Sequence, residues 1–172
     1  MDGDCLTVRT IRIGTRRGGE ANVIEVTGNL IDELPGRGET AKEVHNLTVR
    51  LRVRCPEFEI VGVETEFAVH PQDECRQVIP AMQSLVGLRI AGGFTRAVQE
   101  RLGRYRGCTH IVSLVLAFGT PVHQAAMTLF QPKEPEAAFF EPLIDSCLVW
   151  RRGGELHRRV QRGDLPQLEA LA

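Results

Sequence analysis

One segment limits the possible folds of this 172-residue chain more than any other. From Leu47 to Arg54, apolar and polar residues alternate strictly. Because side chains in a β-strand point to opposite faces at every second residue, this pattern predicts a strand with one apolar face and one mostly basic face. The strand then belongs to a sheet that covers the core with one side only.

The surrounding sequence extends this sheet. Residues 5–13 are rich in β-forming side chains, and the turn signal at 17–20 is followed by a return strand over 22–26. A loop rich in glycine and proline follows at 35–38. The turn after Arg54 predicts a hairpin whose second strand covers 58–69.

Helical patterns begin after residue 70. Pro80 and Gly87 bound a short helix, and a one-sided apolar stripe predicts a second helix over 94–102. Residues 111–118 are apolar on every side, which indicates a buried helix. Pro121 is expected to kink or break this helix, which continues over 122–130.

Strands first and helices later predict an α+β fold, with an N-terminal antiparallel sheet of hairpins and a helical half packed on one face. We expect a single domain over residues 1–172. It would contain a strand-rich part (5–69), a helical part (71–130) and a C-terminal extension (131–172). The arginine-rich tail from Arg151 onward is expected at the surface or partly disordered, and Cys147, in an apolar stretch, is expected to be packed.

Composition narrows the function classes. The formal net charge is −1, which argues against a nucleic-acid or membrane-surface protein. The chain has no run of 18 apolar residues free of charges or breakers, and its first residues do not resemble a secretory signal, so we expect a cytoplasmic protein without a membrane span. Phosphate-loop, dinucleotide-binding and HExxH zinc motifs are absent.

The densest group of reactive side chains is Gly107-Cys108-Thr109-His110, at the start of the predicted buried helix. The positive end of a helix favours the thiolate of a cysteine, which is both the nucleophilic and the metal-binding form. Cys108 and His110 are therefore candidate catalytic residues. A small buried cysteine beside a capping threonine is the alternative interpretation.

Three element junctions are expected to converge. His45 precedes the alternating strand, Cys75 follows the sheet, and Cys108 opens the buried helix. Two thiolates and an imidazole suit zinc or an iron–sulfur cluster. If both cysteines bind one zinc ion, their sulfur atoms lie within about 4 Å of each other. A fourth ligand would be His110, Asn46, Cys147, water or a substrate.

Several motifs occur in the order found in a known bacterial family. They include Val44-His45-Asn46-Leu47, Leu85-Val86-Gly87-Leu88 and the Gly107–His110 tetrapeptide, together with Arg9-Thr10-Ile11, Leu30-Ile31-Asp32, Cys75 and Asp145-Ser146-Cys147. On these residues the chain resembles the domain of unknown function 2889 family over nearly its whole length. The family usually has His-Asp where this chain has His45-Asn46.

A more distant resemblance involves the order of elements. This order is similar to that in iron–sulfur scaffold proteins of the IscU/SufU type. It runs from a hairpin and a third strand to a cysteine, a helix and a second cysteine that opens a buried helix. In these proteins three cysteines and an aspartate or histidine bind zinc or a nascent cluster. The resemblance implies equivalent places for Cys75 and Cys108, whereas His45-Asn46 stands near the remaining cysteine and aspartate without either residue type.

Three hypotheses follow. The first is a metal-binding, IscU-like protein that uses His45, Cys75 and Cys108, assisted by His110 or Cys147, to act on a small or carrier-bound substrate or in sulfur or metal handling. The second is a metal-free enzyme with Cys108 as nucleophile and His110 or His45 as base. The third is a non-catalytic accessory protein that docks an acidic partner on the basic strand face formed by Arg50, Arg52 and Arg54.

Overall fold

The structure is a computed structural model that describes residues 5–35, 41–132 and 136–164. The chain divides into two compact units, residues 1–125 and residues 126–172. The expectation of a single domain stays a prediction.

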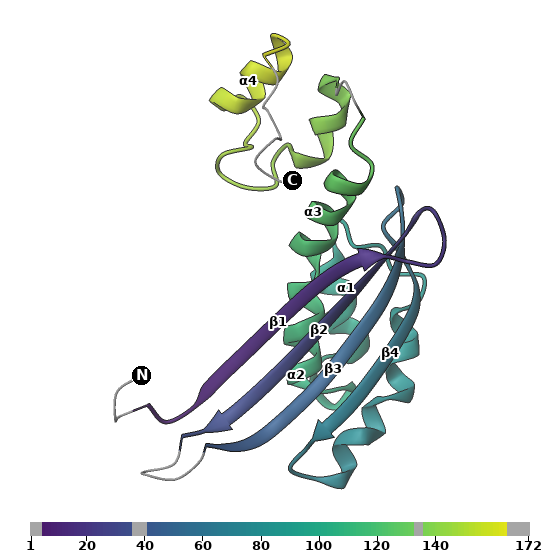
Figure 1. Cartoon of the computed structure of the whole chain (residues 1–172), viewed down its shortest axis with the longest axis vertical. Coiled ribbons are helices and arrows are strands. Elements are labelled where there is room, and N and C mark those ends of the chain that lie inside the picture. Colours follow the sequence, from purple (N-terminus) through teal and green to yellow (C-terminus); the bar gives the residue numbers. More distant parts are fainter. Residues whose placement is uncertain (1–4, 36–40, 133–135, 165–172) are drawn as a thin grey trace. The chain divides into compact units, whose positions relative to one another are not determined.

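The first unit is built on a four-stranded antiparallel sheet with strand order β1-β2-β3-β4 (Figure 1). The strands are β1 (Val8–Arg17), β2 (Val23–Leu34), β3 (Lys42–Arg54) and β4 (Glu59–Val69). Each strand pairs with the next along the chain, so the sheet is a simple meander. The sequence predicted all four strands, but β2 continues to Leu34 instead of ending at Val26.

The alternation in β3 separates the two faces of the sheet as predicted. Leu47, Val49, Leu51 and Val53 are fully buried in the core. On the opposite face, the Arg50 guanidinium pairs with Glu25 on β2 and Glu64 on β4, at 3.2 and 2.7 Å. Carboxylates on both neighbouring strands thus balance the positive charge of this arginine.

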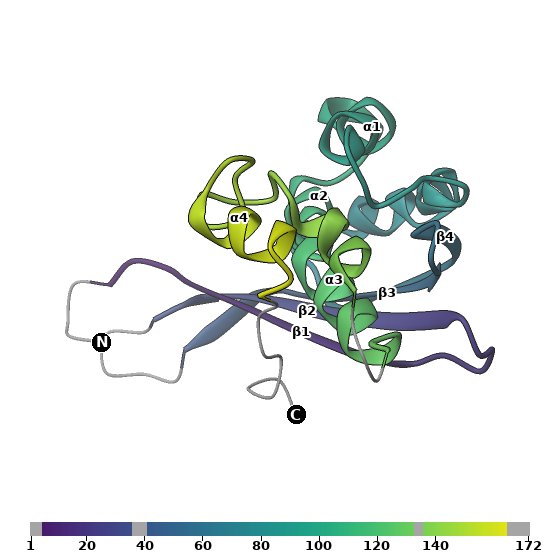
Figure 2. The same cartoon turned by 90° about the horizontal axis from the view of Figure 1, so that it is seen from above.

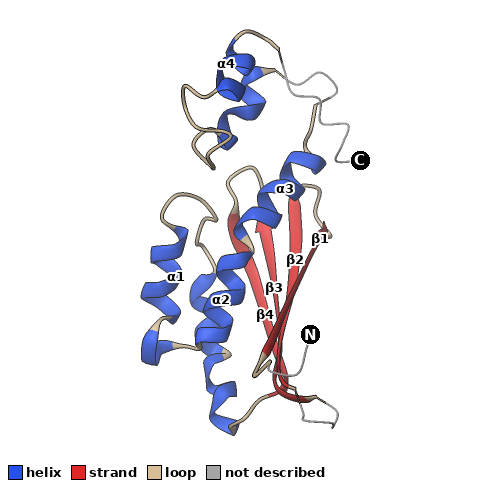
Figure 3. Cartoon of the chain, turned by 90° about the vertical axis from the view of Figure 1, so that its left-hand side faces the viewer, coloured by secondary structure: helices blue, strands red, loops and turns tan. Residues whose placement is uncertain are grey.

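Helices and 3₁₀ turns follow the sheet in the chain. They are η1 (Asp73–Val78), η2 (Pro80–Leu85), α1 (Phe94–Leu102), η3 (Arg104–Arg106), α2 (Thr109–Ala117) and α3 (Gly119–Leu129). Figures 2 and 3 show α1 and α2 on the same side of the sheet. This arrangement confirms the predicted α+β class.

Helix α2 lies close to the sheet because Gly28 on β2 has no side chain. A Cβ atom at this position would lie 2.3 Å from Cε1 of Phe118 and 2.8 Å from Cδ1 of Leu114. Both of these side chains are fully buried. The absence of a side chain at Gly28 therefore sets how closely α2 approaches the strand beneath it.

The helical path breaks at Phe118, three residues before Pro121, as predicted for a proline in this position. Residues Thr109–Leu129 are long and apolar enough to cross a membrane by length and composition, with 39% of the most apolar window buried. Packing against the sheet gives another reason for this apolar character, because Ile111, Leu114 and Val115 belong to the core.

The second unit contains η4 (Ala137–Leu143) and α4 (Glu155–Gln161). Phe140 is fully buried, and its ring stacks on Trp150 with the centroids 5.9 Å apart. One of the two expectations for this region was wrong. Between 151 and 164 the arginine-rich tail is mostly exposed, as expected, and part of it forms α4, which buries His157 and Val160. Cys147 is exposed instead of packed, in a turn that follows η4.

Candidate functional site

A polar row crosses the sheet at one end of its core face. Arg9 on β1 is the cross-strand partner of Asp32 on β2, which in turn is the partner of His45 on β3. The preceding row on the same face consists of Ile11, Leu30 and Leu47. The two-residue period of each strand therefore carries all three polar side chains onto the helix-facing side.

His110 reaches this row from the first turn of α2. The helix begins at Thr109, immediately after an extended Cys108 and a close passage of the chain at Gly107. A Cβ atom at Gly107 would lie 2.3 Å from the carbonyl oxygen of Leu102. Glycine thus lets the chain pass the end of α1 and start α2 beside the sheet.

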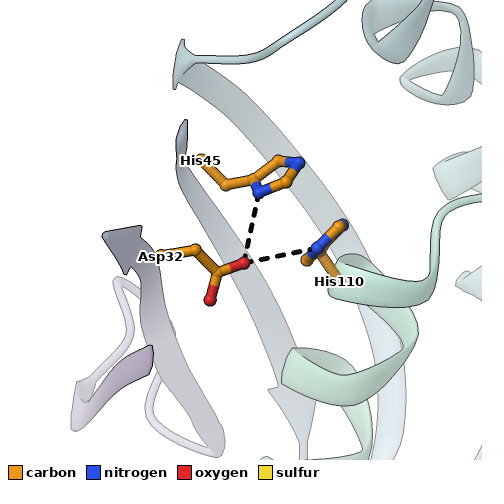
Figure 4. A group of neighbouring side chains, drawn as sticks. All are labelled: Asp32, His45 and His110. Carbon is orange, nitrogen blue, oxygen red and sulfur yellow. Dashed lines mark ion pairs between the residues drawn. The ribbon is translucent and has the colours of Figure 1, made fainter. Parts of the chain in front are cut away.

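Asp32, His45 and His110 meet at a single carboxylate oxygen (Figure 4). Asp32 Oδ2 lies 3.2 Å from His45 Nδ1 and 3.3 Å from His110 Nε2. The two imidazole rings lie against each other, with centroids 3.9 Å apart and a tilt of 31°. Among the described residues, these three offer ligand atoms that all lie within 4.8 Å of one another.

Arg9 holds the Asp32 carboxylate from the other side. Its Nε and a terminal nitrogen donate to the two carboxylate oxygens at 2.6 and 2.8 Å. These hydrogen bonds are the main reason why the pKa of Asp32 is lowered, while burial opposes the shift and both histidines favour it. Asp32 is therefore an ionised carboxylate at neutral pH, with Oδ2 directed at the two histidines.

The electrostatics at His110 favour an uncharged imidazole. Burial is the largest cause that lowers the pKa of His110, followed by the charge of His45, although Asp32 acts in the opposite direction. His45 Nδ1 is buried and forms no hydrogen bond within the described part of the chain, even though Asp32 Oδ2 is at ion-pair distance. Neutral imidazole is the form that binds metals.

The second ring nitrogen of His110 contacts a thiol. Cys108 Sγ lies 3.4 Å from His110 Nδ1, across the first turn of α2. Cys108, His110 and Asp32 thus form a continuous chain from sulfur through imidazole to carboxylate. Such a chain is the arrangement of a nucleophile, a base and an orienting carboxylate.

The histidines open into a pocket of about 630 Å³. Its walls come from His45, the η1 region and the loop that leads into α2. The lining residues are His45, Gln72, Glu74, Cys75, Gln77, Val78, Tyr105, Arg106, Gly107, Cys108, Thr109 and His110.

All four candidate residues from the sequence line this one pocket: His45, Cys75, Cys108 and His110. It stays a prediction that His45, Cys75 and Cys108 bind one metal ion together, with the two sulfur atoms in contact. The side chain of Asn46 is hydrogen-bonded to those of Asn29 and Glu43. Cys147 belongs to the second unit.

The sequence reasoning missed Asp32. The return strand was predicted to end at Val26, which placed Asp32 outside any strand. Leu30 and Asp32 continue the face that holds the buried Ile24 and Val26, so the alternation did contain a signal. Only a longer strand in the correct register would have brought it to His45.

The comparisons with known proteins bear on this geometry. A family model described as "Protein of unknown function (DUF2889)" matches residues 7–124. The chain belongs to this family. The matched residues include the whole polar row and the start of α2, so Arg9, Asp32, His45, Cys108 and His110 all lie within the family region.

Two curated proteins show a partial similarity. CTP synthases of Methylobacterium radiotolerans and Methylobacterium nodulans are each 34% identical over 95 residues. The match covers 50% of this chain but 18% of the length of each relative. No solved structure matches. The likeness to iron–sulfur scaffold proteins therefore has no support from a related structure.

Proposed function

We propose that this protein binds a divalent transition metal, zinc or iron, through Asp32, His45 and His110. The distances at Asp32 Oδ2 carry the proposal. Ligands at about 2.0–2.1 Å from a tetrahedral metal lie about 3.3 Å from each other. The observed spacings of 3.2 and 3.3 Å match the edges of such a site.

The unsatisfied nitrogen of His45 supports the same conclusion. A buried polar atom without a partner is costly, and native proteins rarely leave one. A metal ion among the three side chains would provide the partner that His45 Nδ1 lacks within the described residues.

The surroundings have the features of an outer ligand shell. Metal-bound histidines usually form a hydrogen bond through their other ring nitrogen, and metal-bound carboxylates are themselves hydrogen-bonded. Cys108 is placed to fill the first role at His110 Nδ1, and Arg9 fills the second at Asp32. Cys108 would then orient a ligand instead of binding the metal.

Two histidines and one carboxylate leave coordination positions for water or substrate. A metal with open positions polarises a substrate oxygen or activates a bound water molecule. The neighbouring pocket is large enough for a small molecule. We therefore propose a metal-dependent activity on a small or carrier-bound substrate, with Asp32, His45 and His110 holding the metal.

The second candidate is a metal-free enzyme with Cys108 as nucleophile. The observation that favours it is the chain from Cys108 Sγ through His110 to Asp32, with spacings of 3.4 and 3.3 Å. In this alternative His110 takes the thiol proton and Asp32 orients the imidazole. His45 then has no direct part, which separates the two candidates.

The accessory-protein hypothesis has less support. Of the three arginines that would form the docking face, Arg50 is paired with Glu25 and Glu64, and Arg54 with Glu59. Arg52 lies 3.9 Å from Glu20. An acidic partner would have to displace these internal carboxylates.

The decisive experiment compares His45→Ala with Cys108→Ser. We expect wild type, purified without affinity-tag metals, to hold about one zinc or iron ion per chain by elemental analysis. Zinc affinity is then measured by competition with a chromophoric chelator. His45→Ala loses a ligand, so its zinc affinity should fall by more than the roughly 10–100-fold expected for an outer-shell change such as Cys108→Ser.

Matched controls are His70→Ala and Cys147→Ser, because neither residue belongs to the three-residue group. Circular dichroism verifies that each variant is folded. The proposal fails if wild type binds no metal, or if His45→Ala and His70→Ala bind zinc equally. Fast alkylation of Cys108 that requires His110 and Asp32, but not His45, would support the metal-free enzyme.

A further inference from the structure

The pocket beside the proposed metal site has a wall suited to an anion. We infer that it takes a small carboxylate-bearing molecule, whose carboxylate binds Arg106 while its other end reaches the open metal positions. This inference rests on the proposed function. It names the substrate class of that same site.

The pocket lining is mostly polar, and its positive side chain is Arg106. Gln72, Gln77 and Thr109 add hydrogen-bonding groups, while Val78 is aliphatic. Polar side chains that converge on a cavity orient a ligand and set its specificity. A pocket of this composition does not suit a purely apolar molecule.

The loop that carries Arg106 is held in place at both ends. A Cβ atom at Gly103 would lie 2.3 Å from the backbone oxygen of Gln99, and one at Gly107 would lie 2.3 Å from that of Leu102. Both oxygens belong to α1. The short turn η3 between these glycines ends at Arg106. These close approaches position the backbone of the turn that carries Arg106, whose exposed side chain lines the pocket.

Arg106 is available for a ligand. Its guanidinium carbon lies 4.9 Å from the centre of the Tyr105 ring. No carboxylate in the described part of the chain lies within ion-pair distance of it. The planar fork of arginine donors matches a carboxylate in a two-point contact.

The charges of the pocket favour an anion once a metal is bound. Arg9 already balances Asp32, and Glu74 offsets Arg106 in formal charge. A divalent metal then leaves an excess of positive charge. A dicarboxylate such as succinate offers one carboxylate to Arg106 and a second oxygen-bearing group to the metal, whereas inorganic phosphate is a single compact group.

The test uses Co²⁺ as a visible probe of the metal site. Wild type, Arg106→Gln and the control Arg101→Gln are loaded with Co²⁺ and titrated with succinate, its uncharged diamide succinamide, and inorganic phosphate. Arg101 is exposed and does not line the pocket. Changes in the Co²⁺ absorption report ligand binding.

We expect succinate to bind about tenfold or more weakly to Arg106→Gln, which is the scale of one lost charge-assisted contact, and equally to Arg101→Gln and wild type. Succinamide should bind weakly to all three proteins. Equal succinate binding by both variants would overturn the inference. So would tighter binding of phosphate or succinamide than of succinate.

A failure of the metal proposal is detected separately, as a protein that takes up no Co²⁺. In that case succinate is titrated into the metal-free protein while the NMR signal of the Gly107 amide is followed. Binding that is lost in Arg106→Gln but kept in Arg101→Gln supports the anion site without a metal. No binding, or equal binding by both variants, overturns it.

Discussion

The substitution Gly28→Ala tests how the sheet and α2 together position His110. The added Cβ atom would lie 2.3 Å from the Phe118 ring and 2.8 Å from Leu114, whereas ordinary contacts are 3.4–4 Å. The Phe118 side chain is fully buried. Helix and strand must therefore separate by about 1 Å, and overpacking of this kind costs about 1–3 kcal/mol in the free energy of unfolding.

The assay is urea denaturation followed by far-ultraviolet circular dichroism. The control is Gly14→Ala on the edge strand β1, where a Cβ atom would have nothing within 4 Å. This control should leave the free energy of unfolding within about 0.5 kcal/mol of wild type. Gly28→Ala should also weaken zinc binding relative to Gly14→Ala, because the displaced α2 carries His110 away from Asp32.

A double-mutant cycle with Phe118→Leu tests the cause of the destabilisation. Leucine lacks the ring atoms that would collide with the new Cβ atom. The double variant should therefore be more stable than the sum of the two single effects predicts, by about 0.5 kcal/mol or more. Additive effects, or a Gly28→Ala protein as stable as Gly14→Ala, would refute the proposed close contact between α2 and β2.

Two further predictions concern cysteines outside the site. Iodoacetamide should label Cys147 faster than Cys55 in the folded protein, as measured by peptide mass spectrometry. Backbone hydrogen bonds lower the pKa of Cys147, whereas burial raises that of Cys55 to about 11. Equal labelling rates would contradict these environments. The raised Cys55 pKa also means that its neutral thiol stabilises the fold fully below pH 9, and that this contribution is lost between pH 9 and about 11. Urea denaturation should show that Cys55→Ala loses less stability than wild type over this pH range. If both proteins lose the same amount, Cys55 has no part in the loss.

Parts of the site were accessible from the sequence because they follow local rules. His45 lies on β3 just before the clearest alternating segment at 47–54, and Cys108 and His110 stand at the start of the most apolar helix. These features depend on neighbours within a few residues. The structure places all three, with Cys75, around one pocket.

Asp32 and Arg9 show what local rules cannot give. They are separated by 23 residues, and their contact depends on the register between β1 and β2. Register is set by the turn after β1 and by long-range packing, and a shift of one residue would move Asp32 to the other face. An isolated Ile31-Asp32 pair gives no indication of this alignment.

The sequence alone determined the fold class, the basic and apolar faces of β3 and the burial of α2, because hydrophobic periodicity records which side of each element meets the core. Tertiary structure decided that Asp32, His45 and His110 share one carboxylate oxygen. This meeting requires the register between β2 and β3 and the start of α2 to agree, and the register between β1 and β2 then places Arg9 beside Asp32. Packing across the whole sheet fixes that agreement, including the missing side chain at Gly28 that lets α2 approach the strands.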